Sequence, residues 1–205
     1  MLRGRLVAIL RAGTARHFAT VGAVLIEAGV TAVEATLTTP GALDAIARLA
    51  REAPSHVRIG AGTVLTGDEA RACVDAGASF LVSPVVAPQV IAAGAALGVP
   101  TYAGALSPTE VHAASRAGAP IVKLFPASAV GPGYLRDLRG PLPDVRIMPT
   151  GGIGLDDIGT WLAAGAVAVG LGRPLVGDAT GGGSLDALRG RARRAVAAAS
   201  VQVGS

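Results

Sequence analysis

Lys123 is the residue of this sequence whose chemistry stands out most. It is the only lysine in a chain whose Lys+Arg total is 18, and it lies inside the apolar stretch IVKLFPA. Arginine serves ion pairs well, whereas only an amine forms an imine with a carbonyl carbon. An apolar strand also supplies the burial that lowers the pKa of an amine. The sequence therefore favours Lys123 as a Schiff-base nucleophile, and the structural alternative is an ion-pair partner for Glu34.

Glu34 brings a carboxylate in a second strand-like stretch, VEATLTT, where a period of two puts Glu34, Thr36 and Thr38 on one face. Imine formation and carbon–carbon cleavage move protons through a carbinolamine and an enamine, and one positioned carboxylate can shuttle them. Buried carboxylates without a partner are rare. We expect Glu34 to be the general acid/base, the alternative being a carboxylate that only neutralises Lys123.

Two glycine-rich turns, PTGGI at 149–153 and GLGRPL at 170–175, indicate a phosphate site. Backbone N–H groups of such turns hold phosphate, and Arg173 in the second turn adds a positive charge. The histidines follow no metal-ligand spacing, so we predict no metal and no cofactor.

The elements that must position these residues repeat along the chain. Five phrases share one order: an Ala-rich helical tail, a glycine, and then an apolar run rich in β-formers. Glycine just past a helix end tolerates the left-handed conformation that closes the last turn. These expected cap glycines are Gly29, Gly77, Gly98, Gly118 and Gly165.

Eight strand-like stretches alternate with amphipathic helical segments and predict parallel strands closed into a (β/α)8 TIM barrel. They fall near 6–12, 32–38, 57–63, 79–83, 100–105, 121–126, 146–150 and 166–171. A doubly wound open sheet competes, but the turn LRAGTARH lacks its G-x-G-x-x-G pattern. Barrel sites lie at the C-terminal ends of strands, often with phosphate after strands seven and eight. The two glycine-rich turns occupy those positions.

Length and composition limit the class of protein. The 205 residues are 51% hydrophobic and 16% charged, so we expect one globular domain over 1–205. Cys73 is the only cysteine and is expected to be a small buried apolar residue. No apolar stretch is long enough to cross a membrane, and the cytoplasm is the expected location. The pI of 10.2 raises nucleic-acid binding, but a net charge of only +4 and few aromatics argue against it.

Five motifs occur in order over most of the chain: VEATLTTP, IGAGTVLT, AGASFLVSP, VKLFPA and MPTGGI. Together they resemble the 2-keto-3-deoxy-6-phosphogluconate (KDPG) aldolases and their 4-hydroxy-2-oxoglutarate (KHG) aldolase relatives. The resemblance implies a metal-independent class I aldolase, commonly a homotrimer, that cleaves KDPG to pyruvate and glyceraldehyde 3-phosphate in the Entner–Doudoroff pathway. The phrase SAVGPGYLRDLRGPLP is also similar to relatives that act on the galactonate epimer.

The resemblance assigns Lys123 as the Schiff-base lysine and Glu34 as the general acid/base. For the pyruvate end of the substrate it implies Thr63, Pro84 and Phe125. For the phosphate it implies Thr150, Gly151 and Gly152.

Two departures from the family pattern concern substrate recognition. Thr38 stands where many members have an arginine that contacts the substrate carboxylate, and Arg11 or backbone N–H groups are its expected substitutes. Arg173 stands where relatives often have serine, so it either strengthens phosphate binding or fills the pocket and changes the preferred substrate.

Three hypotheses of function remain. The first is the Schiff-base aldolase. The second is a phosphosugar isomerase or epimerase barrel in which Glu34 is a base and Lys123 an electrostatic aid. The third is a phosphosugar-binding barrel without turnover.

Overall fold

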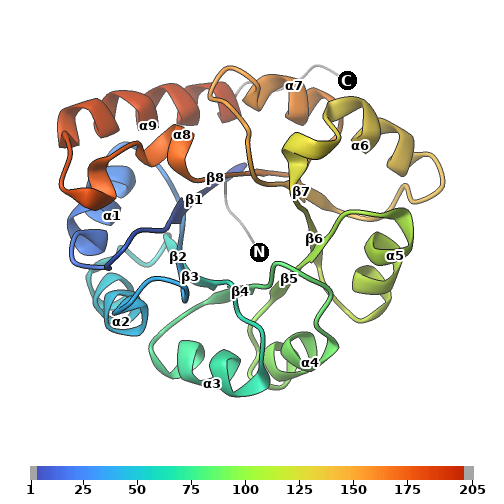
Figure 1. The fold of residues 1–205 in the computed structure, drawn as a ribbon, viewed down its shortest axis with the longest axis horizontal. Coiled ribbons are helices and arrows are strands. Elements are labelled where there is room, and N and C mark those ends of the chain that lie inside the picture. The colour runs from blue at the N-terminus through green and yellow to red at the C-terminus, as the bar shows by residue number, and fades with distance from the viewer. Residues whose placement is uncertain (1–3, 201–205) are drawn as a thin grey trace.

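Eight parallel strands surround the centre of the fold, and the helices lie outside them (Figure 1). The computed structural model describes residues 4–200. The strands are β1 (Leu6–Leu10), β2 (Ala32–Thr36), β3 (Arg58–Gly62), β4 (Phe80–Val82), β5 (Thr101–Ala105), β6 (Ile121–Leu124), β7 (Ile147–Pro149) and β8 (Val169–Leu171). Seven strand pairs run in the order β7-β6-β5-β4-β3-β2-β1-β8, and a bridge from Thr150 to Gly170 joins β7 to β8. The predicted (β/α)8 barrel is confirmed.

The helices follow the strands in turn. They are α1 (Phe18–Glu27), α2 (Ala42–Glu52), α3 (Gly67–Asp75), α4 (Pro88–Ala96), α5 (Pro108–Arg116), α6 (Pro132–Arg139), α7 (Ile158–Ala163), α8 (Arg173–Val176) and α9 (Leu185–Ser200), with 3-10 turns η1 (Ala127–Ala129) and η2 (Ala179–Gly181). All five expected cap glycines have positive φ, from +71° to +102°. Between residues 4 and 200, no helix combines the length and the hydropathy needed to cross a lipid bilayer.

The second predicted strand is shorter than the sequence pattern suggested. It ends at Thr36, because the N–H of Thr39 donates to the carbonyl of Thr36 over 3.0 Å and turns the chain before Pro40. Thr38 therefore lies in a turn, and the prediction that it shares the inner face of the strand with Glu34 was wrong.

The strand registers stack the inward-facing side chains in layers. In a closed barrel of this type each strand is staggered against its neighbour by about one residue, so alternate strands fill one layer. Applied to the registers here, the layer of the even strands contains Glu34 (β2), Val82 (β4), Lys123 (β6) and Gly170 (β8). Strands β2 and β6 are four apart in a ring of eight. Glu34 and Lys123 therefore face each other across the barrel axis.

Candidate active site

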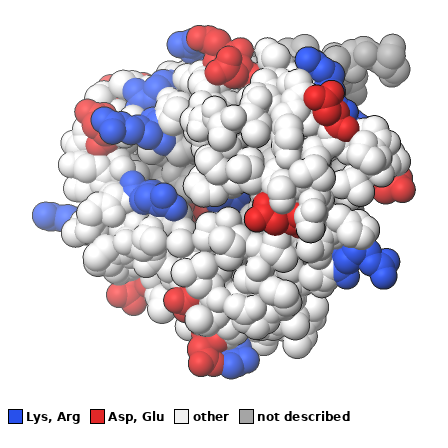
Figure 2. Space-filling model, turned by 45° about the vertical axis from the view of Figure 1, so that its right-hand side comes forward, with Lys and Arg blue, Asp and Glu red and all other residues white. Residues whose placement is uncertain are grey.

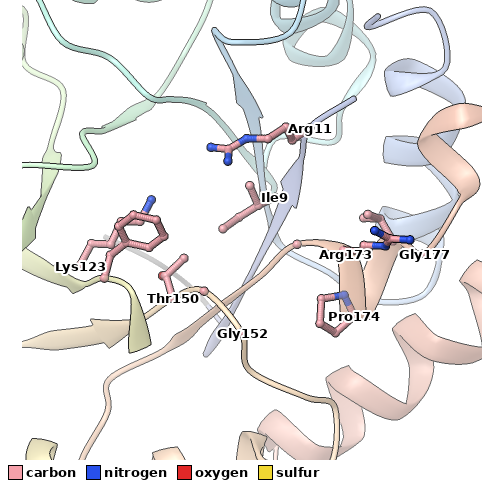
Figure 3. A pocket seen from close by; sticks show the side chains of 12 residues that line it. Ile9, Arg11, Lys123, Thr150, Gly152, Arg173, Pro174 and Gly177 are labelled. Atoms are coloured by element: carbon pink, nitrogen blue, oxygen red, sulfur yellow. The ribbon is translucent and has the colours of Figure 1, made fainter. Parts of the chain in front are cut away.

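A cavity of about 570 Å³ lies at the C-terminal ends of β1, β6, β7 and β8 (Figure 3). Its size falls within the range of about 300–1,000 Å³ that is usual for small-molecule sites. Seven of the predicted site residues line it: Arg11, Lys123, Phe125, Thr150, Gly151, Gly152 and Arg173. The barrel thus brings together residues that lie more than 160 positions apart in the sequence.

Lys123 is buried at the wall of this cavity, with only 5% of its surface exposed. Burial lowers the pKa of its amine, the carboxylate of Glu34 opposes that shift, and the positive charge of Arg11 adds to it. The Nζ atom lies 5.0 Å from the ring centroid of Phe125. The amine is therefore more easily kept neutral than that of a free lysine, and a neutral amine is the form that attacks a carbonyl.

Glu34 is 1% exposed, and within residues 4–200 neither of its carboxylate oxygens has a hydrogen-bond partner. Burial raises its pKa, while the charges of Lys123 and Arg11 lower it. None of the ion pairs between described residues joins Glu34 to Lys123. The ion pair that the sequence left as the structural alternative is therefore not made. Glu34 lies below the cavity lining, in the barrel layer of Lys123, and no hydrogen bond among the described residues holds its carboxylate.

Gly62 is the residue that makes room for Glu34, and sequence reasoning did not find it. A Cβ built at this position would overlap Oε1 of Glu34. Gly170 serves Thr150 in the same way, since a Cβ there would overlap the Thr150 hydroxyl. The signal in the sequence was glycine inside a strand, which marks close approach of another group.

Arg11 leaves the end of β1 and directs its guanidinium into the space that Lys123 enters from the other side (Figure 3). Its Nη2 donates to the hydroxyl of Thr63 over 3.2 Å. Thr63 has a φ of +59° and is the one non-glycine residue between 4 and 200 with positive φ. That conformation is costly for a β-branched residue and is found mainly at functional sites. The strained backbone thus presents a hydroxyl that holds the cavity arginine.

Hydrogen bonds of threonine hydroxyls connect the end of β1 to the end of β2. Thr38 donates to Thr36 over 3.2 Å, and Thr36 donates to the carbonyl of Leu10 over 3.2 Å. The N–H of Ala12 donates to the hydroxyl of Thr39, also over 3.2 Å. Thr38, predicted as a substrate residue, does not line the cavity. Its hydrogen bond instead stabilises the chain segment that carries the cavity arginine.

Pro84 also stands outside the cavity lining. Its backbone crosses the end of β5 so closely that a Cβ at Gly104 would overlap it. Pro84 therefore covers the C-terminal end of the barrel beside β5. This close approach requires glycine at position 104 of that strand.

The two glycine-rich turns also line the cavity, the first beside Phe125 and Lys123 and the second on the side of Arg173 (Figure 3). Gly151 and Gly152 have φ of +93° and +75°, which L-residues rarely adopt. The Thr150 hydroxyl beside them is buried without a hydrogen-bond partner among residues 4–200. Arg173, the first residue of α8, is exposed and lies across the cavity from Lys123 (Figure 3). Backbone N–H groups, a hydroxyl and a guanidinium are thus available to an anion.

The sequence model of one family, the KDPG and KHG aldolases, matches residues 1–184. The chain belongs to this family. Aldolases are carbon–carbon lyases, which places the chain in that enzyme class.

Three relatives illustrate the range of the KDPG and KHG aldolase family. A probable 2-dehydro-3-deoxy-6-phosphogalactonate aldolase of Rhizobium meliloti (strain 1021) is 39% identical over 171 residues, 83% of this chain and 81% of that protein. A 2-dehydro-3-deoxy-phosphogluconate aldolase of Pseudomonas aeruginosa is 43% identical over 136 residues, 66% of this chain and 61% of that protein. A crystal structure of KDPG aldolase from Legionella pneumophila, with pyruvate captured as a covalent carbinolamine, has a TM-score of 0.85 at 27% identity and covers 97% and 96% of the chains.

Changing Gly62→Ala is expected to lower the kcat of this aldolase about 100-fold, the scale of loss when a reacting group is misplaced by an ångström. The added methyl group overlaps Oε1 of Glu34 and pushes the carboxylate off the barrel axis. Steady-state kinetics on the folded variant measure the effect. Gly13→Ala is the matched control, because a Cβ at Gly13 meets no atom within 4 Å. Equal kcat in both variants would show that Gly62 does not set the position of Glu34.

Proposed function

We propose that this aldolase cleaves KDPG to pyruvate and glyceraldehyde 3-phosphate through a Schiff base on Lys123. The proposal rests on a buried lysine, with its pKa lowered by burial, facing the unpaired carboxylate of Glu34 across one barrel layer. The covalent pyruvate carbinolamine of the Legionella relative supports the same chemistry.

The proposed cycle begins when the neutral Nζ of Lys123 attacks the C2 carbonyl carbon of the substrate. The carbinolamine takes up a proton from solvent and loses water to give an iminium ion. Glu34 takes the proton of the C4 hydroxyl, the C3–C4 bond breaks, and its electron pair enters the iminium to form an enamine while glyceraldehyde 3-phosphate departs. Glu34 returns the proton to C3, and water releases pyruvate and restores the amine.

The two ends of the cavity suit the two charged ends of the substrate. Arg11, held by Thr63 close to Lys123, is assigned to the carboxylate in the role that Thr38 is too short to fill. Phe125 packs beside the amine at this pyruvate end, and Pro84 covers the nearby barrel end. The phosphate is assigned to the two glycine-rich turns, with these residues: Thr150, Gly151, Gly152 and Arg173.

The test of the proposal is a mass spectrum after incubation with pyruvate and borohydride, followed by peptide mapping. We expect one reduced pyruvate adduct, located at Lys123. Absence of an adduct from folded protein at saturating pyruvate would overturn the Schiff base and favour the isomerase or epimerase reading, which needs no covalent intermediate.

Cleavage of the galactonate epimer, 2-keto-3-deoxy-6-phosphogalactonate, is the second candidate. The Rhizobium relative bears that name and aligns over a longer part of this chain than the Pseudomonas relative does. The epimers differ at one stereocentre, so kcat/KM for each, with unphosphorylated 4-hydroxy-2-oxoglutarate as a third substrate, ranks the candidates. A preference for the gluconate epimer supports the main proposal.

Arg173→Ser is expected to raise KM for the phosphorylated substrate about tenfold or more, the loss expected for one charge-assisted hydrogen bond to phosphate. The unphosphorylated substrate should be nearly unaffected, because the change lies across the cavity from Lys123. Steady-state kinetics with both substrates measure this difference. An equal change for both would mean that Arg173 does not bind phosphate.

Arg11→Gln is expected to move the acid limb of kcat/KM to higher pH. Burial lowers the pKa of Lys123 most, but Arg11 also lowers it, so removing the guanidinium raises that pKa. The neutral amine then appears only at higher pH. A pH–rate profile against the charge-preserving Arg11→Lys separates this effect from lost carboxylate binding. An acid limb at the same pH in both variants would contradict the electrostatic role.

The proposal extends to the whole chain. We assign residues 1–205 to one domain, acting as a homotrimer in the cytoplasm. The family resemblance supports the trimer, and the large apolar side chains of Leu65 and Val85, 43% and 51% exposed, offer contact area near the strand ends. Light scattering after gel filtration measures the oligomeric state, and a monomer at micromolar concentration would contradict it.

A further inference from the structure

Three arginines form one layer at the N-terminal end of the barrel, opposite the cavity. By the same registers that pair Glu34 with Lys123, the lowest layer of the odd strands contains Arg5 before β1, Arg58 of β3, Pro100 before β5 and Arg146 before β7. Two further layers of side chains separate this layer from that of Glu34 and Lys123. The arginine layer is therefore not part of the cavity.

The backbone of each arginine continues the strand ladder, which fixes the direction of its side chain. The carbonyl of Arg5 accepts from the N–H of Val169 over 2.9 Å, and that of Arg146 accepts from Val122 over 2.8 Å. Alternation along the strands then turns these side chains to the inner face, like those of the barrel interior above them. All three arginines are half-buried, as expected for side chains that enter a narrow mouth.

No ion pair between described residues joins the arginine layer to a carboxylate. The ion pairs formed within residues 4–200 use other arginines, namely Arg48, Arg71, Arg189 and Arg194. In the layer itself, Arg5 donates to a backbone carbonyl, that of Ala166, over 3.4 Å. Like charges in a confined, partly desolvated place repel one another, and this repulsion is relieved by a multiply charged anion.

Tyr102 provides a fourth polar group near the arginine layer. It occupies the next layer of odd strands, and its ring stacks on Phe80 with centroids 5.4 Å apart. Burial raises the pKa of the Tyr102 phenol to about 12, and the charges of Arg146 and Arg58 oppose that rise. Such an effect requires the two guanidinium groups to be close to the phenol. The stacked rings form an apolar floor, and the phenol is a hydrogen-bond donor near Arg58 and Arg146.

We propose that this N-terminal mouth binds a compact, multiply charged oxyanion of the phosphate class, at a site separate from the cavity. Guanidinium groups bind phosphate oxygens through paired N–H donors, and three arginines share one inward-facing layer here, on alternate strands of a closed barrel. The closed ring of strands excludes the backbone of a long polyanion, so the occupant is free phosphate or the phosphate group of a small metabolite. This inference stands independently of the aldolase chemistry.

The test uses inorganic phosphate as the probe, at constant ionic strength with chloride as the balancing anion. Isothermal titration and the midpoint of thermal unfolding are measured for the unmodified protein, Arg58→Gln, Arg146→Gln and the control Arg193→Gln. The control removes the same charge from the exposed face of α9, where Arg193 makes none of the ion pairs recorded between residues 4 and 200. Two variants from different strands keep the test open should one fail to fold.

We expect phosphate to raise the unfolding midpoint of the unmodified protein and of Arg193→Gln. In Arg58→Gln and Arg146→Gln the affinity of the N-terminal mouth for phosphate should weaken about tenfold or more, the loss expected for one charge-assisted hydrogen bond, while the cavity still binds phosphate. Borohydride should still trap the pyruvate adduct in Arg58→Gln and Arg146→Gln. If no protein of the series gives the adduct, that result counts against the Schiff base and not against the phosphate site. The same phosphate response in all four proteins would overturn the proposed site. A methyl phosphate titration then separates free phosphate from a phosphate ester as the preferred ligand.

Discussion

Lys123→Arg is expected to lower kcat/KM for aldol cleavage by about four orders of magnitude or more, the scale of loss when a covalent nucleophile is removed. A guanidinium keeps the positive charge and the length of the side chain but does not form a useful imine. Steady-state kinetics and borohydride trapping measure the two consequences together. We expect both turnover and the pyruvate adduct to be lost.

The charge-preserving substitution separates the three hypotheses of function. If Lys123 only helped electrostatically, as in an isomerase or epimerase, arginine would retain much of the activity. If the barrel only bound a phosphosugar, the unmodified protein would show no pyruvate release and Lys123→Arg would still bind. Arg193→Gln, on the exposed face of α9, is the control for a general effect of a cation change. Activity of Lys123→Arg within tenfold of the unmodified protein would contradict the Schiff base.

The sequence predicts the barrel and its two central residues for a simple physical reason. Glycine caps and apolar runs are local signals, and each of the five expected caps has the positive φ that its position requires. A single lysine in an arginine-rich chain, and a carboxylate inside an apolar strand, are equally local.

The charged side chains in Figure 2 occur singly or in small groups, and no continuous basic surface covers that face.

What the sequence does not predict depends on register and on space across the barrel. Gly62 is required because Oε1 of Glu34 occupies the volume of its missing side chain, and that contact joins β2 to β3. The alternation of VEATLTT puts Thr38 on the strand face, but a hydrogen-bonded turn at Thr36 ends the strand two residues earlier. The arginine layer at the other mouth likewise appears only when all strand registers are combined.

Glu34→Gln is expected to lower the rate of cleavage about 10²- to 10⁴-fold, the usual contribution of a positioned general acid/base. The amide keeps the shape of the side chain but neither accepts the C4 hydroxyl proton nor returns it to C3. Exchange of the pyruvate methyl protons with deuterium, followed by NMR, reports enamine formation without any need for the full substrate. We expect that exchange to slow by a similar factor.

The direction in which Glu34→Gln changes the pKa of Lys123 separates a loss of proton transfer from a loss of the nucleophile. Burial is the main cause of the lowered pKa of Lys123, and the Glu34 carboxylate partly reverses it. Removing the carboxylate charge therefore lowers the pKa of the amine further and leaves more of it neutral at a given pH. The nucleophile is then at least as available in Glu34→Gln, so adduct should still accumulate on Lys123 during long incubation with borohydride. Slow exchange with a trapped adduct would assign the loss to proton transfer, whereas exchange at the unmodified rate would remove Glu34 from that role.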